Sequence, residues 1–156
     1  MSENIVLQTQ KGQFTCRVAA IILCEDKILM VKHKDYDCLY TVGGKVKLGE
    51  STEEAVIREA IEETKCNYEI ERLAFIHERF FDFKGIKQHE IIFYYYMKEN
   101  DETRYLEGRN TDQGINETLH LLKIKDLPNE NVIPDFFKTI EIKRETAITH
   151  IISKED

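Results

Sequence analysis

The amino-terminal third of the chain carries two apolar runs that are separated by a short polar turn. Phe14–Cys24 is rich in β-branched and apolar residues, and Lys27–His33 is apolar on both faces of an extended strand. The acidic pair Glu25-Asp26 lies between them and suits a turn. This order predicts a β-hairpin. A further short strand, Leu39–Val42, is expected to end at the two glycines that follow it.

The segment Ser51–Lys65 has the clearest helical pattern in the chain. Ser51 can cap the helix, and Glu54, three residues later, completes a capping box. On a helical wheel of 100° per residue, the apolar side chains fall on one broad arc, which we expect to be buried. The residues of this arc are Val56, Ile57, Ala60, Ile61 and Thr64.

The remainder of the chain is expected to supply more strands and one helix. Lys84-Gly85 forms the turn between two long strands, and the aromatic run Phe93–Tyr96 is typical of core packing. Strands before and after a helix predict a mixed sheet with helices on its faces, in a single domain that spans residues 1–156. The predicted elements are strands Tyr68–Phe83, Gln88–Met97 and Thr118–Ile124, a helix Pro134–Arg144 and an edge strand Thr146–Ile152.

Composition and charge exclude several classes of function. The net charge of −7 disfavours a DNA or RNA duplex as the main partner, because phosphate backbones attract basic surfaces. The longest apolar run, Val18–Cys24, has seven residues, whereas a membrane-spanning helix needs about 20. Residues Met1–Asn4 begin no secretory signal, and the four cysteines form no CxxC pair. We therefore expect a cytoplasmic protein, monomeric or homodimeric, that does not bind membranes.

The polar face of the predicted helix gathers three carboxylates. Glu59, Glu62 and Glu63 fall within roughly 100° of one another on the wheel, opposite the apolar arc. Ala55 lies among them, and its small side chain leaves room for a ligand. Ionised carboxylates this close repel one another unless a cation sits between them. Oxygen ligands favour Mg²⁺ or Mn²⁺, although a solvated acidic face has the same spacing.

The surrounding residues extend this group to a fixed pattern. It reads Gly, five residues, Glu, seven residues, Arg-Glu, two residues, Glu-Glu, and it resembles the signature of the Nudix hydrolases. The resemblance implies a Nudix-type α/β/α sandwich with a mixed β-sheet, in an enzyme that hydrolyses diphosphate linkages of nucleotide-like substrates with Mg²⁺. The matching residues are Gly44, Glu50, Arg58, Glu59, Glu62 and Glu63.

The chain departs from the family pattern at three positions. The family usually places a glycine two residues after the paired glutamates and an aliphatic residue next, where this chain has Lys65 and Cys66. That glycine normally ends the helix in a left-handed conformation. Val42 replaces a proline that often precedes the double glycine. None of these changes removes a carboxylate, so they bear on the backbone more than on activity.

The resemblance implies a role for each matching residue. Glu59, Glu62 and Glu63 correspond to metal ligands, Glu50 to a supporting loop glutamate, and Arg58 to the arginine that orients neighbouring carboxylates. The glycines correspond to a turn that lets the backbone approach metal and phosphate, which makes Gly43 a candidate metal contact and both Gly43 and Gly44 candidate substrate contacts. Arg17 and Lys45 are weaker candidates for substrate binding.

Family members often use another glutamate outside the signature as a ligand or base. Glu117 is our first candidate, because it is expected at the end of a polar loop, just before a strand. Glu90 is the second candidate, at the start of the aromatic strand, and Glu50 remains a third. The substrate stays open among modified nucleoside triphosphates, nucleoside diphosphate sugars and dinucleoside polyphosphates. The competing functions are a non-catalytic Nudix-fold nucleotide sensor or regulator and an acidic structural domain without a ligand.

Overall fold

The computed structural model describes residues 3–139, 141–142 and 147–155. Within these residues the chain forms eleven strands, one α-helix and three short 3₁₀ helices. The strands are β1 (Val6–Thr9), β2 (Gly12–Ile21), β3 (Leu23–Cys24), β4 (Lys27–His33), β5 (Leu39–Lys45), β6 (Ile70–Phe83), β7 (Ile86–Met97), β8 (Asn110–Thr111), β9 (Gly114–Lys123), β10 (Val132–Ile133) and β11 (Thr149–Lys154). The helices are α1 (Thr52–Thr64), η1 (Asp101–Tyr105), η2 (Ile124–Asn129) and η3 (Asp135–Lys138).

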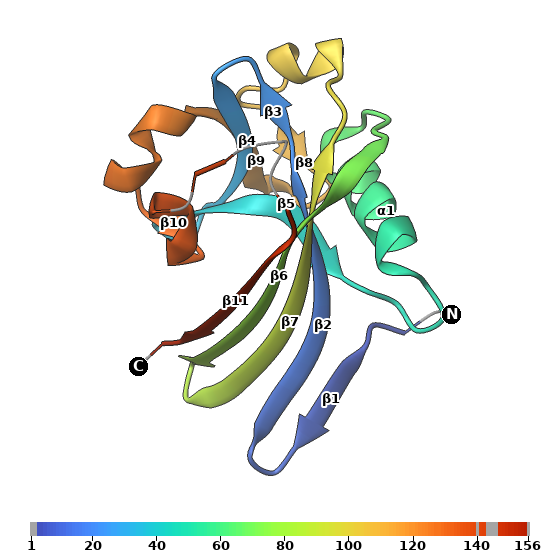
Figure 1. Ribbon diagram of the computed structural model, residues 1–156, viewed down its shortest axis with the longest axis vertical. Helices are drawn as coiled ribbons and strands as arrows, with labels where there is room; N and C mark the ends of the chain where they lie inside the picture. Colours follow the sequence, from blue (N-terminus) through green and yellow to red (C-terminus); the bar gives the residue numbers. More distant parts are fainter. Residues whose placement is uncertain (1–2, 140, 143–146, 156) are drawn as a thin grey trace.

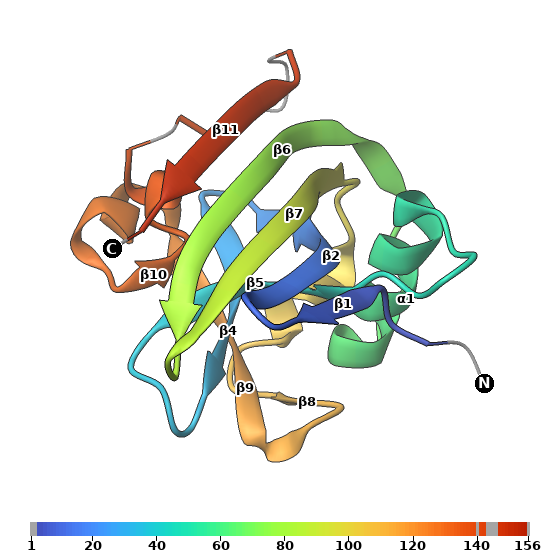
Figure 2. The same ribbon diagram turned by 90° about the horizontal axis from the view of Figure 1, so that it is seen from below.

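The strands join into one mixed sheet in the order β11-β6-β7-β2-β5-β4-β9-β8, with β1 on β2, β10 on β5 and β3 on β4. β2 runs parallel to β7, β6 to β11 and β5 to β10, and the remaining pairs are antiparallel. Helix α1 lies on one side of the sheet and the segment η2–η3 on the other (Figures 1 and 2). The predicted three-layer α/β arrangement is confirmed, although the second outer layer consists of 3₁₀ turns.

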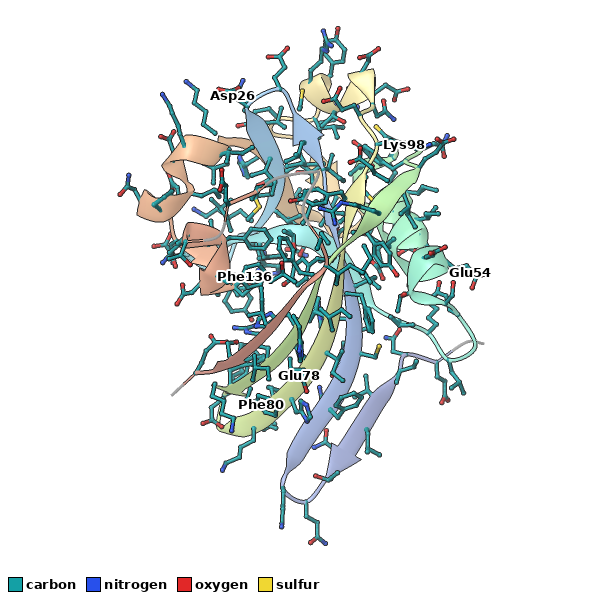
Figure 3. The ribbon with its side chains drawn as sticks, in the orientation of Figure 1. Asp26, Glu54, Glu78, Phe80, Lys98 and Phe136 are labelled. Carbon is teal, nitrogen blue, oxygen red and sulfur yellow. The ribbon has the colours of Figure 1, made fainter. Side chains whose placement is uncertain are left out.

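Side chains that alternate along the central strands point into two separate hydrophobic cores, one on each face of the sheet. In β2, Val18 and Ala20 face α1, whereas Ala19 and Ile21 face the η2–η3 side. β4 divides in the same way between the two clusters, which explains why its sequence is apolar on both faces. The run Phe93–Tyr96 packs into these cores as expected. On the η2–η3 side, the ring of Phe136, labelled in Figure 3, contacts Phe75, His77 and Tyr94 of the sheet.

The predicted amino-terminal hairpin is only partly right. The turn at Glu25-Asp26 exists, but it joins β4 to the two residues of β3. The long strand β2 instead pairs with β1, β5 and β7. The prediction failed because β2 lies in the middle of the sheet, where β7 takes one of its edges and β1 and β5 take the other, so that only Leu23–Cys24 of the first apolar run pairs with β4. Among the described residues, no helix is long and apolar enough to span a membrane.

Two expectations for the carboxyl-terminal third need correction. The helix predicted for Pro134–Arg144 is a single 3₁₀ turn, η3, with Pro134 at its start, while Ile140, Lys143 and Arg144 lie outside the described residues. The polar segment before Glu117 is the turn of a β8–β9 hairpin, so Glu117 lies within a strand. The predicted final edge strand is confirmed as β11, which pairs with β6; Thr146 lies outside the described residues.

Helix α1 begins and ends with the predicted local structures. Ser51 and Glu54 form the reciprocal capping box. At the other end Lys65 adopts the left-handed conformation, with φ of 62°, and its backbone N–H donates to the carbonyl of Ile61. The wheel was wrong at Ile61, which is 37% exposed, because the sheet covers only the part of the helix nearest β2 and β5.

Replacing Lys65 with glycine is expected to stabilise the protein by roughly 1 kcal/mol, because glycine adopts a positive φ without a Cβ clash. Urea unfolding curves of the two proteins measure this difference. Lys65→Ala is the matched control: it also loses the bond from Nζ to the carbonyl of Glu62 but retains a Cβ. If both variants are less stable than the parent, the amine contributes more to stability than backbone strain costs.

Candidate active site

Helix α1 directs the carboxylate of Glu63 toward the sheet rather than into open solvent. Glu63 is only 7% exposed, and its Oε2 accepts a 3.2 Å hydrogen bond from the backbone N–H of Gly43 in β5. Ala55, which we expected beside an open ligand space, is fully buried in the core under the helix. Glu63 therefore lies at the contact between α1 and β5. Ala55 packs in the core and leaves no space for a ligand.

The two glycines allow this close approach, but they do so within a strand. β5 continues through Gly43 and Gly44 to Lys45, which corrects the expected turn. A Cβ on Gly44 would lie 2.4 Å from the carboxylate carbon of Glu59, and a Cβ on Gly43 would lie 2.2 Å from the carbonyl oxygen of Val18. Only residues without a side chain leave room here for a neighbouring strand and a carboxylate.

Arg58 ties the acidic residues together. Its Nε and Nη2 donate to the two oxygens of Glu50, at 2.7 and 3.0 Å. Its Nη1 donates to Glu59 at 2.8 Å and to Glu62 at 3.3 Å, while Nη2 also bonds the carbonyl of Lys45 at 3.1 Å. A planar guanidinium has five donors, so one side chain can hold all of these acceptors in fixed directions. The predicted orienting role of Arg58 matches this geometry.

Glu50 is committed to supporting that network. The hydrogen bond from Arg58 is the main cause of its lowered pKa, and the backbone N–H of Lys47 adds a further bond of 2.9 Å. Both oxygens of this carboxylate are therefore occupied. What sets this carboxylate apart is that its main partner is a cation, because the guanidinium of Arg58 favours the ionised form and lowers the pKa. Such a group positions its neighbours and is poorly suited to accept a proton from a water molecule.

Burial dominates the electrostatics of the inner carboxylates. The pKa of Glu63 is raised to about 9, mainly by burial and in addition by the charges of Glu117 and Glu59. Burial also raises the pKa of Glu59, against the lowering effect of Arg58. A divalent cation would reverse this balance by compensating the charge of all three groups. The donors are oxygens only, which fits Mg²⁺ or Mn²⁺.

The carboxylates do not yet form a closed cage. Across the described part of the chain, no three His, Cys, Asp or Glu side chains converge closely enough to hold a cation. Arg58 keeps Glu59 and Glu62 turned toward itself. Binding of a cation therefore requires small rotations of these side chains, for which the helix spacing leaves the backbone unchanged.

Glu117 joins the signature residues from a distant strand. Tyr40 in β5 donates its hydroxyl proton to one carboxylate oxygen, and Thr111 in β8 donates to the other at 2.8 Å. The charge of Glu117 is the largest Coulombic influence on Glu63. The structure thus brings Glu117 to the acidic group, although it reaches it from a strand and not from the expected loop. Tyr40 and Thr111 carry no motif, so the sequence offered no signal for them.

A cleft of about 520 Å³ adjoins this acidic group, and we call it the sheet cleft. Its volume lies within the range of small-molecule sites. Five of the predicted site residues line it, namely Gly43, Glu63, Glu117, Arg17 and Lys45. The other signature residues, Gly44, Glu50, Arg58, Glu59 and Glu62, are not among its lining residues and form the network behind it.

Glu90 also lines the sheet cleft, but in different surroundings. Its carboxylate lies 3.9 Å from a guanidinium nitrogen of Arg17 and 4.0 Å from one of Arg79. It does not contribute to the raised pKa of Glu63, unlike Glu117. The sequence did not identify Arg79 as a site residue. It lies two residues before Phe81 on β6, so the two side chains share one face of the strand.

The family model of the NUDIX domain matches residues 14–140, which is most of the chain. The protein belongs to the Nudix family. It is accordingly a Nudix-type pyrophosphohydrolase. No curated protein matches the chain.

Solved structures share the fold of this Nudix protein. A MutT protein from Bacillus halodurans is 22% identical, with a TM-score of 0.67 over 87% of this chain and 89% of that one. A MutT protein from Methanosarcina mazei Go1 is 20% identical, with a TM-score of 0.60 over 83% and 91%. A NUDIX-family hydrolase from Clostridium perfringens is 23% identical, with a TM-score of 0.56 over 79% and 91%. At these identities the likeness concerns the fold.

The two glycines are expected to respond differently to alanine. Gly44→Ala displaces the carboxylate of Glu59, the mobile end of a side chain, and should reduce kcat/KM by tenfold or more, on the order of a lost positioning contact, with a nearly unchanged melting temperature. In Gly43→Ala the new Cβ clashes with the backbone of Val18, which cannot move aside easily, so this change should lower the free energy of unfolding by about 1–3 kcal/mol. Steady-state kinetics and thermal unfolding separate the two. Full activity of Gly44→Ala would contradict the role given to Glu59.

Proposed function

We propose that this Nudix protein hydrolyses, with Mg²⁺, the diphosphate linkage of a nucleoside diphosphate joined to another group. The observation that carries the proposal is the juxtaposition of Glu63, buried with a raised pKa, and Glu117 beside a cleft of small-molecule size. Buried carboxylates without a nearby cation are costly, and they become useful when a metal ion and a phosphate arrive together.

Glu59, Glu62 and Glu63 would hold the cation, with the backbone of Gly43 close by. A bound Mg²⁺, or Mn²⁺ in its place, supplies positive charge for the non-bridging oxygens and acidifies a coordinated water. Arg58 keeps Glu59 and Glu62 on the side of the helix that faces β5, and Glu50 fixes Arg58. These bonds limit the conformations of the carboxylates before a cation arrives, so that only side-chain rotations of Glu59 and Glu62 remain for binding.

Glu117 is the residue that we assign to proton acceptance. Tyr40 and Thr111 fix both of its oxygens, so the carboxylate has one orientation. The partners of Glu117 are neutral hydroxyl groups, whereas Glu50 is paired with the cationic Arg58, which lowers its pKa, and Glu90 lies beside two arginines. Of the three candidates, Glu117 combines proximity to Glu63 with a position on the wall of the sheet cleft.

Cationic and aromatic groups of the sheet cleft suit the rest of such a substrate. Lys45 can pair with phosphate oxygens, Arg17 can donate to an oxygen of the substrate, and Tyr36 and Phe81 offer apolar surface for a base. An acidic surface with these few local cations favours a small phosphorylated ligand over a nucleic acid duplex. We further infer a single domain in a monomer or homodimer. The four free thiols support a reducing, cytoplasmic setting.

The alternative function is a Nudix-fold sensor that binds a nucleotide without cleaving it. The intact set of carboxylates favours catalysis, because a pure binder needs fewer of them. Incubation with a panel of nucleotide substrates and Mg²⁺, read as phosphate release after pyrophosphatase treatment, distinguishes the two. Saturable binding without any turnover in this panel would favour the sensor.

Metal dependence is the first expectation of this proposal. Mg²⁺ or Mn²⁺ should raise the melting temperature, and a chelator should abolish turnover, because the cation relieves repulsion among the carboxylates. Glu62→Gln and Glu63→Gln should each lower kcat by orders of magnitude, roughly 10²-fold or more, without unfolding the protein. Glu53→Gln is the control, since Glu53 is exposed on the first turn of α1. Hydrolysis that persists in excess chelator would refute the metal role.

Glu117→Gln is expected to lower kcat by roughly 10²–10⁴-fold and to leave KM nearly unchanged, because proton acceptance matters in the transition state. Glu90→Gln should lower kcat much less. Tyr40→Phe is the matched control: it removes the donor to Glu117 but keeps the carboxylate, so its loss should be smaller than that of Glu117→Gln. A Glu117→Gln enzyme with unchanged kcat and a raised KM would assign this residue to binding.

A further inference from the structure

Glu90 is a buried carboxylate whose hydrogen-bonding capacity the protein does not use. The residue is 8% exposed and lies on β7, opposite Arg79 of β6 and Thr15 of β2. Its two closest charged partners, Arg17 and Arg79, are 3.9 and 4.0 Å away, beyond hydrogen-bond distance. Within the described part of the chain, no hydrogen bond reaches its oxygens. A carboxylate in this position is costly unless donors arrive from the cleft.

The two arginines beside Glu90 are held differently. Arg79 is fixed by two hydrogen bonds to Glu155, of 2.5 and 3.1 Å, and its guanidinium lies 3.8 Å from the ring centre of Phe81. Arg17 has Glu90 as its only ion-pair partner among the residues that the structure describes. Arg79 is therefore part of the wall, whereas the donors of Arg17 remain available to a ligand.

The same face of β6 offers a surface for a planar ring. Phe81 and Phe83 follow Arg79 at alternate positions, and all three line the sheet cleft. Tyr36 approaches Phe83 from the loop before β5, with ring centres 6.4 Å apart. Aromatic side chains beside a carboxylate and a free guanidinium are the usual components of a site that stacks a base and reads its edge.

The order of donors and acceptors selects among the bases. The two oxygens of Glu90 can accept two adjacent N–H groups, and Arg17 beside them can donate to a carbonyl oxygen. Guanine presents this complement on one edge, with O6 next to N1–H and the exocyclic amine. Adenine offers its amine next to an acceptor nitrogen, and uracil offers one N–H between two acceptors, so each would set a lone pair against the carboxylate.

We propose that Glu90, with Arg17, is the specificity-determining pair of this enzyme and selects substrates whose base presents two adjacent N–H donors, as guanine does. The inference rests on the proposed function, because it names the base of the substrate that the same cleft receives. Glu90 then acts in recognition, and Glu117 acts in chemistry.

The test compares kcat/KM for matched guanosine, inosine, adenosine and uridine triphosphates with Mg²⁺. Inosine differs from guanosine only by the missing exocyclic amine, and its kcat/KM should fall roughly tenfold to a hundredfold. Glu90→Gln should reduce the guanosine-to-inosine ratio to near one, because an amide cannot accept both N–H groups. Glu78→Gln is the control: Glu78 lies on β6 outside the sheet cleft and bonds His150. It should leave the ratio unchanged.

Several results would overturn the inference. They are equal kcat/KM values for the four bases in the parent enzyme, an equal loss on every base in Glu90→Gln, and a preference that depends on the ribose 2′-hydroxyl instead of the base. The equal loss would mean a catalytic role for Glu90. Equal values for the four bases in the parent enzyme would refute the inference even if Glu90→Gln does not fold.

Binding separates this inference from the proposed function. Calorimetry with guanosine, inosine and adenosine monophosphates requires no turnover. If none of the triphosphates is hydrolysed, the hydrolase function fails for these substrates. Tighter binding of guanosine monophosphate that is lost in Glu90→Gln would still support base selection, and equal affinities for the three nucleotides would refute it.

Discussion

The bonds of the Arg58 guanidinium are the interactions on which the rest of the site depends. One side chain joins the helix to the loop glutamate, to two helix carboxylates and to the carbonyl of Lys45. These bonds relieve the repulsion among Glu50, Glu59 and Glu62, whereas Glu63 has no bond to Arg58 and accepts from the backbone of Gly43 instead. The network around Arg58 therefore forms without a metal ion.

Close packing between α1 and β5 imposes a second constraint. Gly44 leaves room for the carboxylate of Glu59, Gly43 leaves room for the backbone of β2, and the N–H of Gly43 donates to Glu63. The consequence is a buried carboxylate with a raised pKa, which costs stability in the metal-free protein. A destabilising charge of this kind suits a site for a cation, because the cation would compensate the carboxylates and could then attract a phosphate.

The sheet cleft divides its polar groups by task. Near β5 and β9, carboxylates face one another and gain from a cation. Along β2, β6 and β7, a single carboxylate lies between two arginines beside aromatic rings. Pairing β2 with both β5 and β7 brings the two groups into one cleft, because this strand forms one wall shared by them. A substrate with a charged diphosphate and a planar base matches this division.

The sequence by itself determined the features that depend on short-range geometry. The capping box, the left-handed end at Lys65 and the directions of Arg58 and its glutamates follow from residues within a few helical turns. The mixed sheet with a helix on one face was likewise predictable from the order of apolar runs.

Only the tertiary structure decided the features that join distant strands. The partners of Glu117 are 77 and 6 residues away in sequence, and both come from other strands, β5 and β8. The pairing of Glu90 with Arg17 and Arg79 follows from the registers of β2, β6 and β7, which no local pattern specifies. The burial of Ala55 and exposure of Ile61 also depend on how the sheet lies under α1. Helical spacing is a property of one backbone segment, whereas strand register is settled by the packing of both cores together.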